Sequence, residues 1–105
     1  DGAIAGVLER TDFINGQDVK EFEKELAAYH GTSYAIACAN GTDAIQIALM
    51  AMDFPAGSEV ITPGFSYAAI AEMCHLLGLR PVYCDVDPNT YLMDVGHVES
   101  LLSHS

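Results

Sequence analysis

The chain has 105 residues, of which half are apolar, and its 15 acidic side chains against 4 basic ones give a net charge of -11. This charge argues against nucleic acid and against anionic membrane surfaces as ligands, because both would repel it. The apolar content is enough for a core and too high for a disordered chain, and the length suits one small domain or a piece of a larger one.

The first predicted element is an amphipathic helix over residues 17–29, which follows a turn at Asn15-Gly16. Its apolar side chains recur at helical spacing, and the glycine after it supplies a stop. The apolar positions are Val19, Phe22, Leu26 and Tyr29, and the stop is Gly31. We interpret its charged residues as a solvated face and not as a partner surface.

A buried strand over residues 34–39 is predicted next, because the segment is apolar on both faces, as a central parallel strand is. A tight turn at Asn40-Gly41 then leads into a helix over residues 42–52. This helix is apolar almost all round, so we expect it to be buried.

The remaining elements alternate between strands and helices. The pattern predicts a strand over 59–62, a helix over 65–77 that Gly78 ends, a strand over 80–85 and a helix over 95–102. Such alternation is typical of an α/β domain with a mostly parallel sheet and helices on both faces.

The cysteines and histidines indicate no metal site. Cys38, Cys74 and Cys84 lie in apolar segments without CxxC spacing, so we expect buried, reduced thiols. The four histidines form no ligand cluster with the carboxylates. With no apolar run long enough to span a bilayer and no signal-peptide pattern, these features favour a cytoplasmic protein.

The turn at Asn40-Gly41 is the strongest candidate site. It delivers Thr42 and Asp43 onto a helix N-terminus, where the first N–H groups have no partner inside the helix and the dipole favours negative charge. We therefore expect a phosphate group over Gly41, Thr42 and Asp43. Neither GxGxxG nor the lysine of a P-loop is present. A plain helix cap remains an alternative.

Two further features follow predicted strands, at the edge of the sheet where ligands of α/β proteins gather. The first is the segment 62–67, whose Tyr67 is suited to stacking on a planar ring, although a half-buried core position for Tyr67 is an equal alternative. The second is the pair Asp85 and Asp87, which we interpret as strand-end structure. Together with the phosphate turn, they suggest a phosphorylated, planar ligand.

Five stretches of the chain together resemble the DegT/DnrJ/EryC1/StrS family of pyridoxal-phosphate-dependent nucleotide-sugar aminotransferases. They are FING at 13–16, VKEFE at 19–23, ANGTDAIQIAL at 39–49, GSEVITPGFSY at 57–67 and PVYCDVDP at 81–88. The resemblance implies the large domain of aminotransferase fold type I. The chain would be its N-terminal part, with a first segment and helix over 1–31 and alternating strands and helices over 32–105.

The resemblance also implies roles for single residues. Gly41–Asp43 would hold the phosphate of pyridoxal 5'-phosphate, Tyr67 would stack on its pyridine ring, and Asn15 and Gly16 would approach the sugar substrate. The family's Schiff-base lysine and the acid that pairs with the pyridine nitrogen are expected beyond Ser105. No catalytic role is therefore transferred to any residue of this chain.

The function implied by the resemblance is transfer of an amino group, usually from glutamate, to a nucleotide-linked keto sugar. Such sugars serve cell-surface polysaccharides or secondary metabolites, and the enzyme would be a homodimer with its active site near the subunit interface. Two alternatives are a sugar dehydratase of the same family and a non-catalytic module that binds a phosphorylated metabolite. By itself this chain is expected to be inactive, and unstable or oligomeric, because the fold leaves strand edges and apolar faces uncovered.

Overall fold

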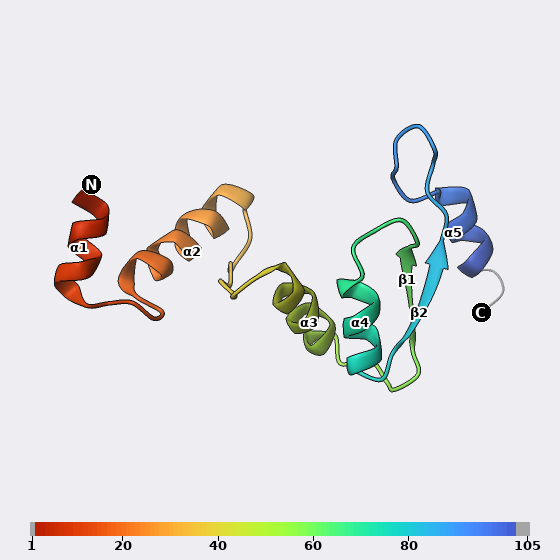
Figure 1. Cartoon of the computed structure of the whole chain (residues 1–105), viewed down its shortest axis with the longest axis horizontal. Coiled ribbons are helices and arrows are strands. Elements are labelled where there is room, and N and C mark those ends of the chain that lie inside the picture. The colour runs from red at the N-terminus through yellow and green to blue at the C-terminus, as the bar shows by residue number, and fades with distance from the viewer. Residues whose placement is uncertain (1, 103–105) are drawn as a thin grey trace. The chain divides into compact units, whose positions relative to one another are not determined.

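The computed structural model describes residues 2–102 and divides into two compact units, Asp1–Cys38 and Ala39–Ser105. Figure 1 shows the elements in chain order. The first unit contains α1 (Gly2–Arg10) and α2 (Gln17–His30). The second contains α3 (Gly41–Ala51), β1 (Glu59–Pro63), α4 (Ala69–Leu76), β2 (Arg80–Cys84) and α5 (Val95–Leu102). No helix within residues 2–102 combines the length and apolar character needed to cross a bilayer.

The first unit confirms the predicted amphipathic helix and adds one that was missed. The helix α2 ends at Gly31, whose φ of 67° is left-handed and whose N–H donates to carbonyls of the last turn. The additional helix, α1, carries Ile4, Val7 and Leu8 at helical spacing, a signal that could have revealed it. An ion pair of 2.6 Å between Arg10 Nη2 and Asp18 Oδ2 joins α1 to α2.

The predicted strand over 34–39 is wrong for the described residues, where this segment forms no β-ladder. A strand needs a neighbour with which to exchange backbone hydrogen bonds, and the one sheet within residues 2–102 consists of β1 and β2. The Ala37 N–H instead donates to Glu23 Oε1 at 2.7 Å, and the side chain of Ile36 is 75% exposed. The apolar sequence is present, but Tyr34 and Ile36 remain exposed in the described part of the chain.

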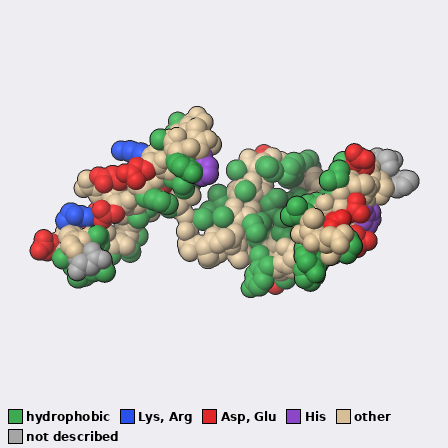
Figure 2. Space-filling view, turned by 90° about the horizontal axis from the view of Figure 1, so that it is seen from above, with side chains coloured by type: hydrophobic (Ala, Val, Ile, Leu, Met, Phe, Trp, Pro, Cys, Tyr) green, Lys and Arg blue, Asp and Glu red, His purple; other side chains and the backbone are tan. Residues whose placement is uncertain are grey.

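Two predictions of burial are wrong for the same reason, namely that covering elements are missing from the described residues. The helix α3 contains no buried residue, and both Ile47 and Met50 on it are exposed. Cys38 is exposed as well, whereas Cys74 and Cys84 are buried free thiols, as expected. On the face seen in Figure 2, hydrophobic side chains make up a large part of the surface of the second unit.

The second unit is organised around a parallel pair of strands, β1 and β2, with Glu59 opposite Arg80 and Pro63 opposite Cys84. Figure 1 shows α4 on one side of the strands and α5 on the other. The parallel pairing confirms the predicted parallel α/β arrangement, in two-stranded form. The buried residues of the second unit are Thr62, Ala69, Cys74, Leu79 and Cys84.

The helix α4 begins at Ala69, four residues later than predicted. Just beyond β1, the Gly64 N–H donates to the Cys84 carbonyl at 2.9 Å, which holds the chain against β2 past the end of the strand. Phe65 is engaged with the Tyr91 ring, with centroids 5.6 Å apart. The segment 64–68 is therefore an irregular bend that carries Tyr67 between β1 and α4.

The loop after β2 gives a testable pH dependence. The carboxylate of Asp87 accepts hydrogen bonds from the backbone N–H groups of Thr90 (2.9 Å) and Asn89 (2.8 Å), and these bonds lower its pKa. Because the folded pKa is depressed, the turn gains stability above the ordinary pKa of aspartate, about 3.9, and loses it as the pH falls through the lowered value. In an NMR titration, we expect the Asn89 and Thr90 amide shifts to move with this low-pH step. An Asp87→Asn variant should lack the step, and the prediction fails if the wild-type amides do not respond.

Candidate functional site

The start of α3 is capped by the side chain of Asn40. Its Oδ1 accepts a hydrogen bond from the Asp43 N–H at 2.9 Å, and its Nδ2 donates to Asp43 Oδ2 at 3.1 Å. The Asp43 N–H is thus already engaged by the cap. The N–H groups of the first turn that have no carbonyl partner inside the helix, and remain for an external anion, are those of Gly41 and Thr42.

A cavity of about 470 Å³ lies in the second unit, and this volume falls within the range of small-molecule sites. It brings together three residues named from the sequence, Gly41, Thr42 and Tyr67, whereas Asp43 is not among its lining residues. The lining contains hydroxyl groups and apolar surface but no charged side chain. The lining residues are Gly41, Thr42, Ile45, Thr62, Pro63, Ser66, Tyr67, Ala69 and Ile70.

Gly41 has no structural reason to be a glycine within this chain. Its φ is not in the left-handed region, and a Cβ built on it would meet no atom within 4 Å. The space above its backbone is open. A glycine that neither the fold nor the packing requires, on the wall of a cavity, suits the close approach of a ligand to the helix N-terminus.

Tyr67 is not a core residue of the described chain, since it is 82% exposed. The alternative of a half-buried core tyrosine is therefore wrong for this part of the protein. Its position in the bend between β1 and α4 places it on the wall of the same cavity as Gly41 and Thr42. An exposed aromatic ring on a cavity wall is suited to covering a planar ligand.

Thr62 is a cavity residue to which the sequence had assigned no role. It is 1% exposed, and its Oγ1 is buried without a hydrogen-bond partner among residues 2–102. A buried hydroxyl in this state is uncommon, because native proteins pair most buried polar groups. No sequence pattern could have revealed it, since a threonine in a β-strand is ordinary.

Comparison with known proteins decides the family. Residues 1–105 match the DegT/DnrJ/EryC1/StrS aminotransferase family. The chain belongs to this family. It is 48% identical over 103 residues to the UDP-2-acetamido-2-deoxy-3-oxo-D-glucuronate aminotransferase of Pseudomonas aeruginosa. This match covers 98% of the chain but only 29% of that relative, so the chain spans less than a third of its length.

Solved structures of the DegT/DnrJ/EryC1/StrS family confirm the predicted fold class. A DegT DnrJ EryC1 StrS aminotransferase from Brucella abortus matches with a TM-score of 0.91 and 44% identity, over 98% of this chain and 28% of that one. The E. coli GDP-4-keto-6-deoxy-D-mannose-3-dehydratase matches with a TM-score of 0.85 and 30% identity, over 99% and 28%. The chain therefore has part of the type I aminotransferase fold. The dehydratase structure contains bound hydrated pyridoxal phosphate, the cofactor expected from the family resemblance.

The cavity residues fit the cofactor of this DegT/DnrJ/EryC1/StrS relative. The N–H groups of Gly41 and Thr42 and the Thr42 hydroxyl are suitable donors for phosphate oxygens. Tyr67 is available for the pyridine ring. Because the lining has no basic side chain, this part of the protein would hold a phosphate through backbone amides and hydroxyls alone.

The predicted substrate residues Asn15 and Gly16 belong to the first unit, at the start of α2. A Cβ on Gly16 would lie 2.5 Å from the Asp12 carbonyl oxygen, so packing alone requires this glycine. Asn15 has a φ of 51°, a conformation that asparagine tolerates better than most residues. Both residues thus have a structural explanation, and their approach to a sugar stays a prediction.

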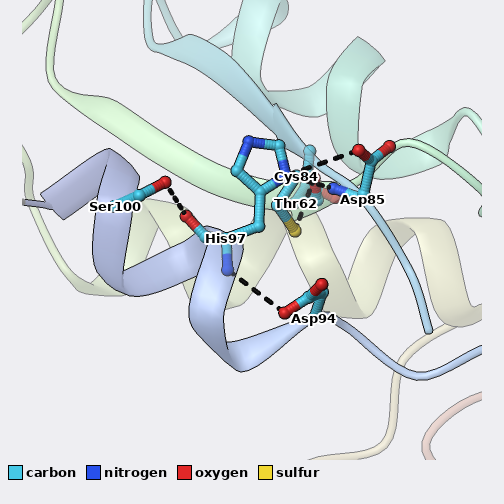
Figure 3. A network of polar contacts seen from close by, with 6 residues as sticks. All are labelled: Thr62, Cys84, Asp85, Asp94, His97 and Ser100. Carbon is cyan, nitrogen blue, oxygen red and sulfur yellow. Dashed lines mark hydrogen bonds and ion pairs between the residues drawn. The ribbon is translucent and has the colours of Figure 1, made fainter.

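A polar cluster at the end of β2 joins this strand to α5 (Figure 3). The Asp85 N–H donates to His97 Nδ1 at 2.9 Å, and Asp94 Oδ1 accepts from the His97 N–H at 3.2 Å. An accepting Nδ1 places the ring proton of a neutral His97 on Nε2. Within residues 2–102, no three side chains of the metal-ligating types gather into a possible metal site. We interpret the cluster as structural.

Proposed function

We propose that the intact protein is a pyridoxal-phosphate-dependent aminotransferase that moves an amino group from glutamate to a nucleotide-linked keto sugar. In this proposal residues 1–105 are the N-terminal part of the cofactor-binding large domain. The observation that carries it is the single cavity that holds both the first turn of α3 and Tyr67. The only lysines, Lys20 and Lys24, lie on α2, and we assign them no catalytic role.

In the proposed site, the residues of this chain bind and orient the cofactor. The Gly41 and Thr42 N–H groups donate to phosphate oxygens, and the hydrogen bonds between Asn40 and Asp43 keep the first helical turn in place. The ring of Tyr67 covers one face of the pyridine. When bound, pyridoxal phosphate supplies an electron sink for the charge that develops as the amino group is transferred.

The proposed substrate class follows from the relative in Pseudomonas aeruginosa, whose name describes a UDP-linked 3-oxo sugar. We propose a substrate of this kind, made for a surface polysaccharide or a secondary metabolite, and a homodimer with its active site near the subunit interface. A cytoplasmic location is proposed with it, because the buried thiols of Cys74 and Cys84 are unpaired and suit a reducing compartment.

The experiment that tests this function uses the intact protein with pyridoxal phosphate, ¹⁵N-glutamate and a UDP-linked 3-oxo sugar. We expect mass spectrometry to find ¹⁵N in the sugar product, and unlabelled glutamate should give the same product without the label. A protein that binds the cofactor but changes neither glutamate nor the sugar would contradict the proposal and favour a non-catalytic binding module.

A second candidate function is a sugar dehydratase of the same family. It is favoured by the similarity to the E. coli GDP-4-keto-6-deoxy-D-mannose-3-dehydratase. The same reaction mixture separates the two functions. A dehydratase would yield a sugar that has lost a hydroxyl group and gained no nitrogen label, whereas an aminotransferase would yield a sugar that carries the label.

A further inference from the structure

The peptide unit that joins Cys84 to Asp85 lies at the end of β2 and is hydrogen-bonded on both sides. Its carbonyl oxygen, on Cys84, accepts from the Gly64 N–H at 2.9 Å, and its N–H, on Asp85, donates to His97 Nδ1 at 2.9 Å. Figure 3 shows the His97 ring beside Asp85. A trans peptide is planar, so its C=O and N–H point in opposite directions. One side of the unit is therefore held by α5, and the other side holds the chain that follows β1.

The backbone of His97 is anchored beside the end of β2. Asp94 Oδ1 accepts from the His97 N–H at 3.2 Å in the first turn of α5, and the Asp94 N–H donates to the Asp85 carbonyl at 2.9 Å. These two bonds attach the start of α5 to the chain just past β2. The His97 ring is therefore already in place to accept from the Asp85 N–H before any ligand binds.

The other side of the peptide unit holds the bend over 64–68. The hydrogen bond from the Gly64 N–H to the Cys84 carbonyl keeps the chain against β2 just past β1, and three residues later the bend places Tyr67 on the wall of the cavity. Hydrogen bonds made through one peptide unit strengthen each other, because each polarises the group that makes the next. A change at His97 therefore affects the bend.

We propose that His97 is a positioning residue, which fixes the peptide unit that holds the bend and so fixes the place of the Tyr67 ring beside the cofactor. The inference rests on the proposed function, because it requires Tyr67 to stack on pyridoxal phosphate. His97 is not among the residues that line the cavity, so it acts through the backbone and not by contact with the ligand.

This role requires a neutral Nδ1, because a protonated ring carries a hydrogen there and cannot accept from the Asp85 N–H. Two carboxylates contact His97, namely Asp85, whose Oδ2 lies 3.6 Å from Nδ1, and Asp94 at the backbone N–H. The other titratable groups of α5 and of β2, against which α5 packs, are Glu99, Arg80, Tyr83 and Cys84. On protonation Nδ1 would donate to the Asp85 carboxylate instead, and the peptide unit would lose its bond to α5. Cofactor affinity should therefore fall as the pH decreases through the range in which histidines gain their charge.

Two variants separate the acceptor from the proton. His97→Asn keeps an acceptor, the amide oxygen, near the position of Nδ1, and that oxygen takes up no proton near neutral pH. His97→Leu removes the acceptor. At about pH 8 the dissociation constant of pyridoxal phosphate should be about two- to fivefold higher for His97→Leu than for the wild type, and close to the wild type for His97→Asn. At about pH 6 the wild type should bind more weakly than His97→Asn and approach His97→Leu.

The measurement is an absorbance titration of the intact apoprotein with pyridoxal phosphate at both pH values, for the wild type and both His97 variants. Comparison at the same pH removes the pH dependence of the cofactor itself. A thermal melt confirms that each protein is folded. The same three proteins are then titrated with Tyr67→Ala added. If His97 acts through Tyr67, the difference between His97→Leu and the wild type should disappear in that background.

The inference is overturned if His97→Leu binds the cofactor as tightly as the wild type at about pH 8, even if its melting temperature falls, since His97 would then only anchor α5. It is also overturned if the ratio between the wild type and His97→Asn is the same at both pH values, or if the deficit of His97→Leu persists with Tyr67→Ala. Tyr67→Ala by itself separates this failure from that of the proposed function. If it weakens cofactor binding and His97→Leu does not, the cofactor site stands without His97; if neither does, both proposals fail.

Discussion

Substitution of Gly41 by alanine is expected to raise the dissociation constant of pyridoxal phosphate by tenfold or more, about 1.4 kcal/mol, without lowering the stability of the apoprotein. The methyl group would enter the open space above the first turn of α3, where the proposed phosphate must approach the backbone N–H groups. No stability is lost, because the new Cβ meets no atom within 4 Å and the backbone is not left-handed. Alanine is also a better helix former than glycine.

A titration of the intact apoprotein with pyridoxal phosphate and a thermal melt measure the two effects of the Gly41 substitution. Gly2→Ala is a matched control, because Gly2 is also a helical glycine with open space around its missing side chain. This control should change neither the affinity nor the melting temperature. An unchanged affinity in Gly41→Ala would refute the assigned phosphate position.

Substitution of Tyr67 by alanine is expected to weaken cofactor binding by about ten- to a hundredfold. Aromatic stacking contributes about 0.5–1.5 kcal/mol beyond area burial, and the covered ring face adds a hydrophobic contribution. The side chain is 82% exposed in this chain, so its removal should affect the stability of the second unit little. The loss is therefore a loss of binding and not of folding.

The matched variant for this prediction is Tyr67→Phe, which keeps the ring and removes only the hydroxyl. We expect it to bind pyridoxal phosphate almost as tightly as the wild type, whereas Tyr67→Ala does not. Fluorescence or absorbance titration provides the affinities, and circular dichroism confirms that each variant is folded. If the alanine and phenylalanine variants bind equally well, Tyr67 does not stack on the cofactor.

Elements that depend on local signals could be predicted from the sequence. The helix α2 and the end of α4 follow from apolar spacing and from the glycines that stop them, and both Gly31 and Gly78 have left-handed φ values. The parallel pair β1 and β2 followed from the alternation of elements. These signals act within a few residues, so the chain itself contains enough information.

Elements that depend on distant partners could not be predicted for this chain. The segment 34–39 has the composition of a central strand but forms none here, and the apolar helix α3 remains largely exposed. Both predictions assumed covering elements, and the described residues do not supply them. An apolar pattern indicates which surface a segment buries in the complete fold, but it does not indicate whether the covering strand or helix is present.

Some features of the candidate site could likewise be predicted from local signals, and others could not. The first turn of α3 and Tyr67 were predictable because a glycine turn, a helix start and the family resemblance point to the same positions. The hydrogen bond from the Asp43 N–H to the Asn40 side chain agrees with the helix cap that the sequence left open as an alternative at this turn. The unpaired hydroxyl of Thr62 depends on what lies around it in space, and only the structure reveals it.

The direct succession of β1, α4 and β2 has a consequence for how the polypeptide reaches its native state. These three elements follow one another along the chain and pack together, so closing the loop between the strands costs little entropy. The three elements can therefore assemble as one local group that fixes Thr62 and Tyr67 in place before contacts with more distant segments form.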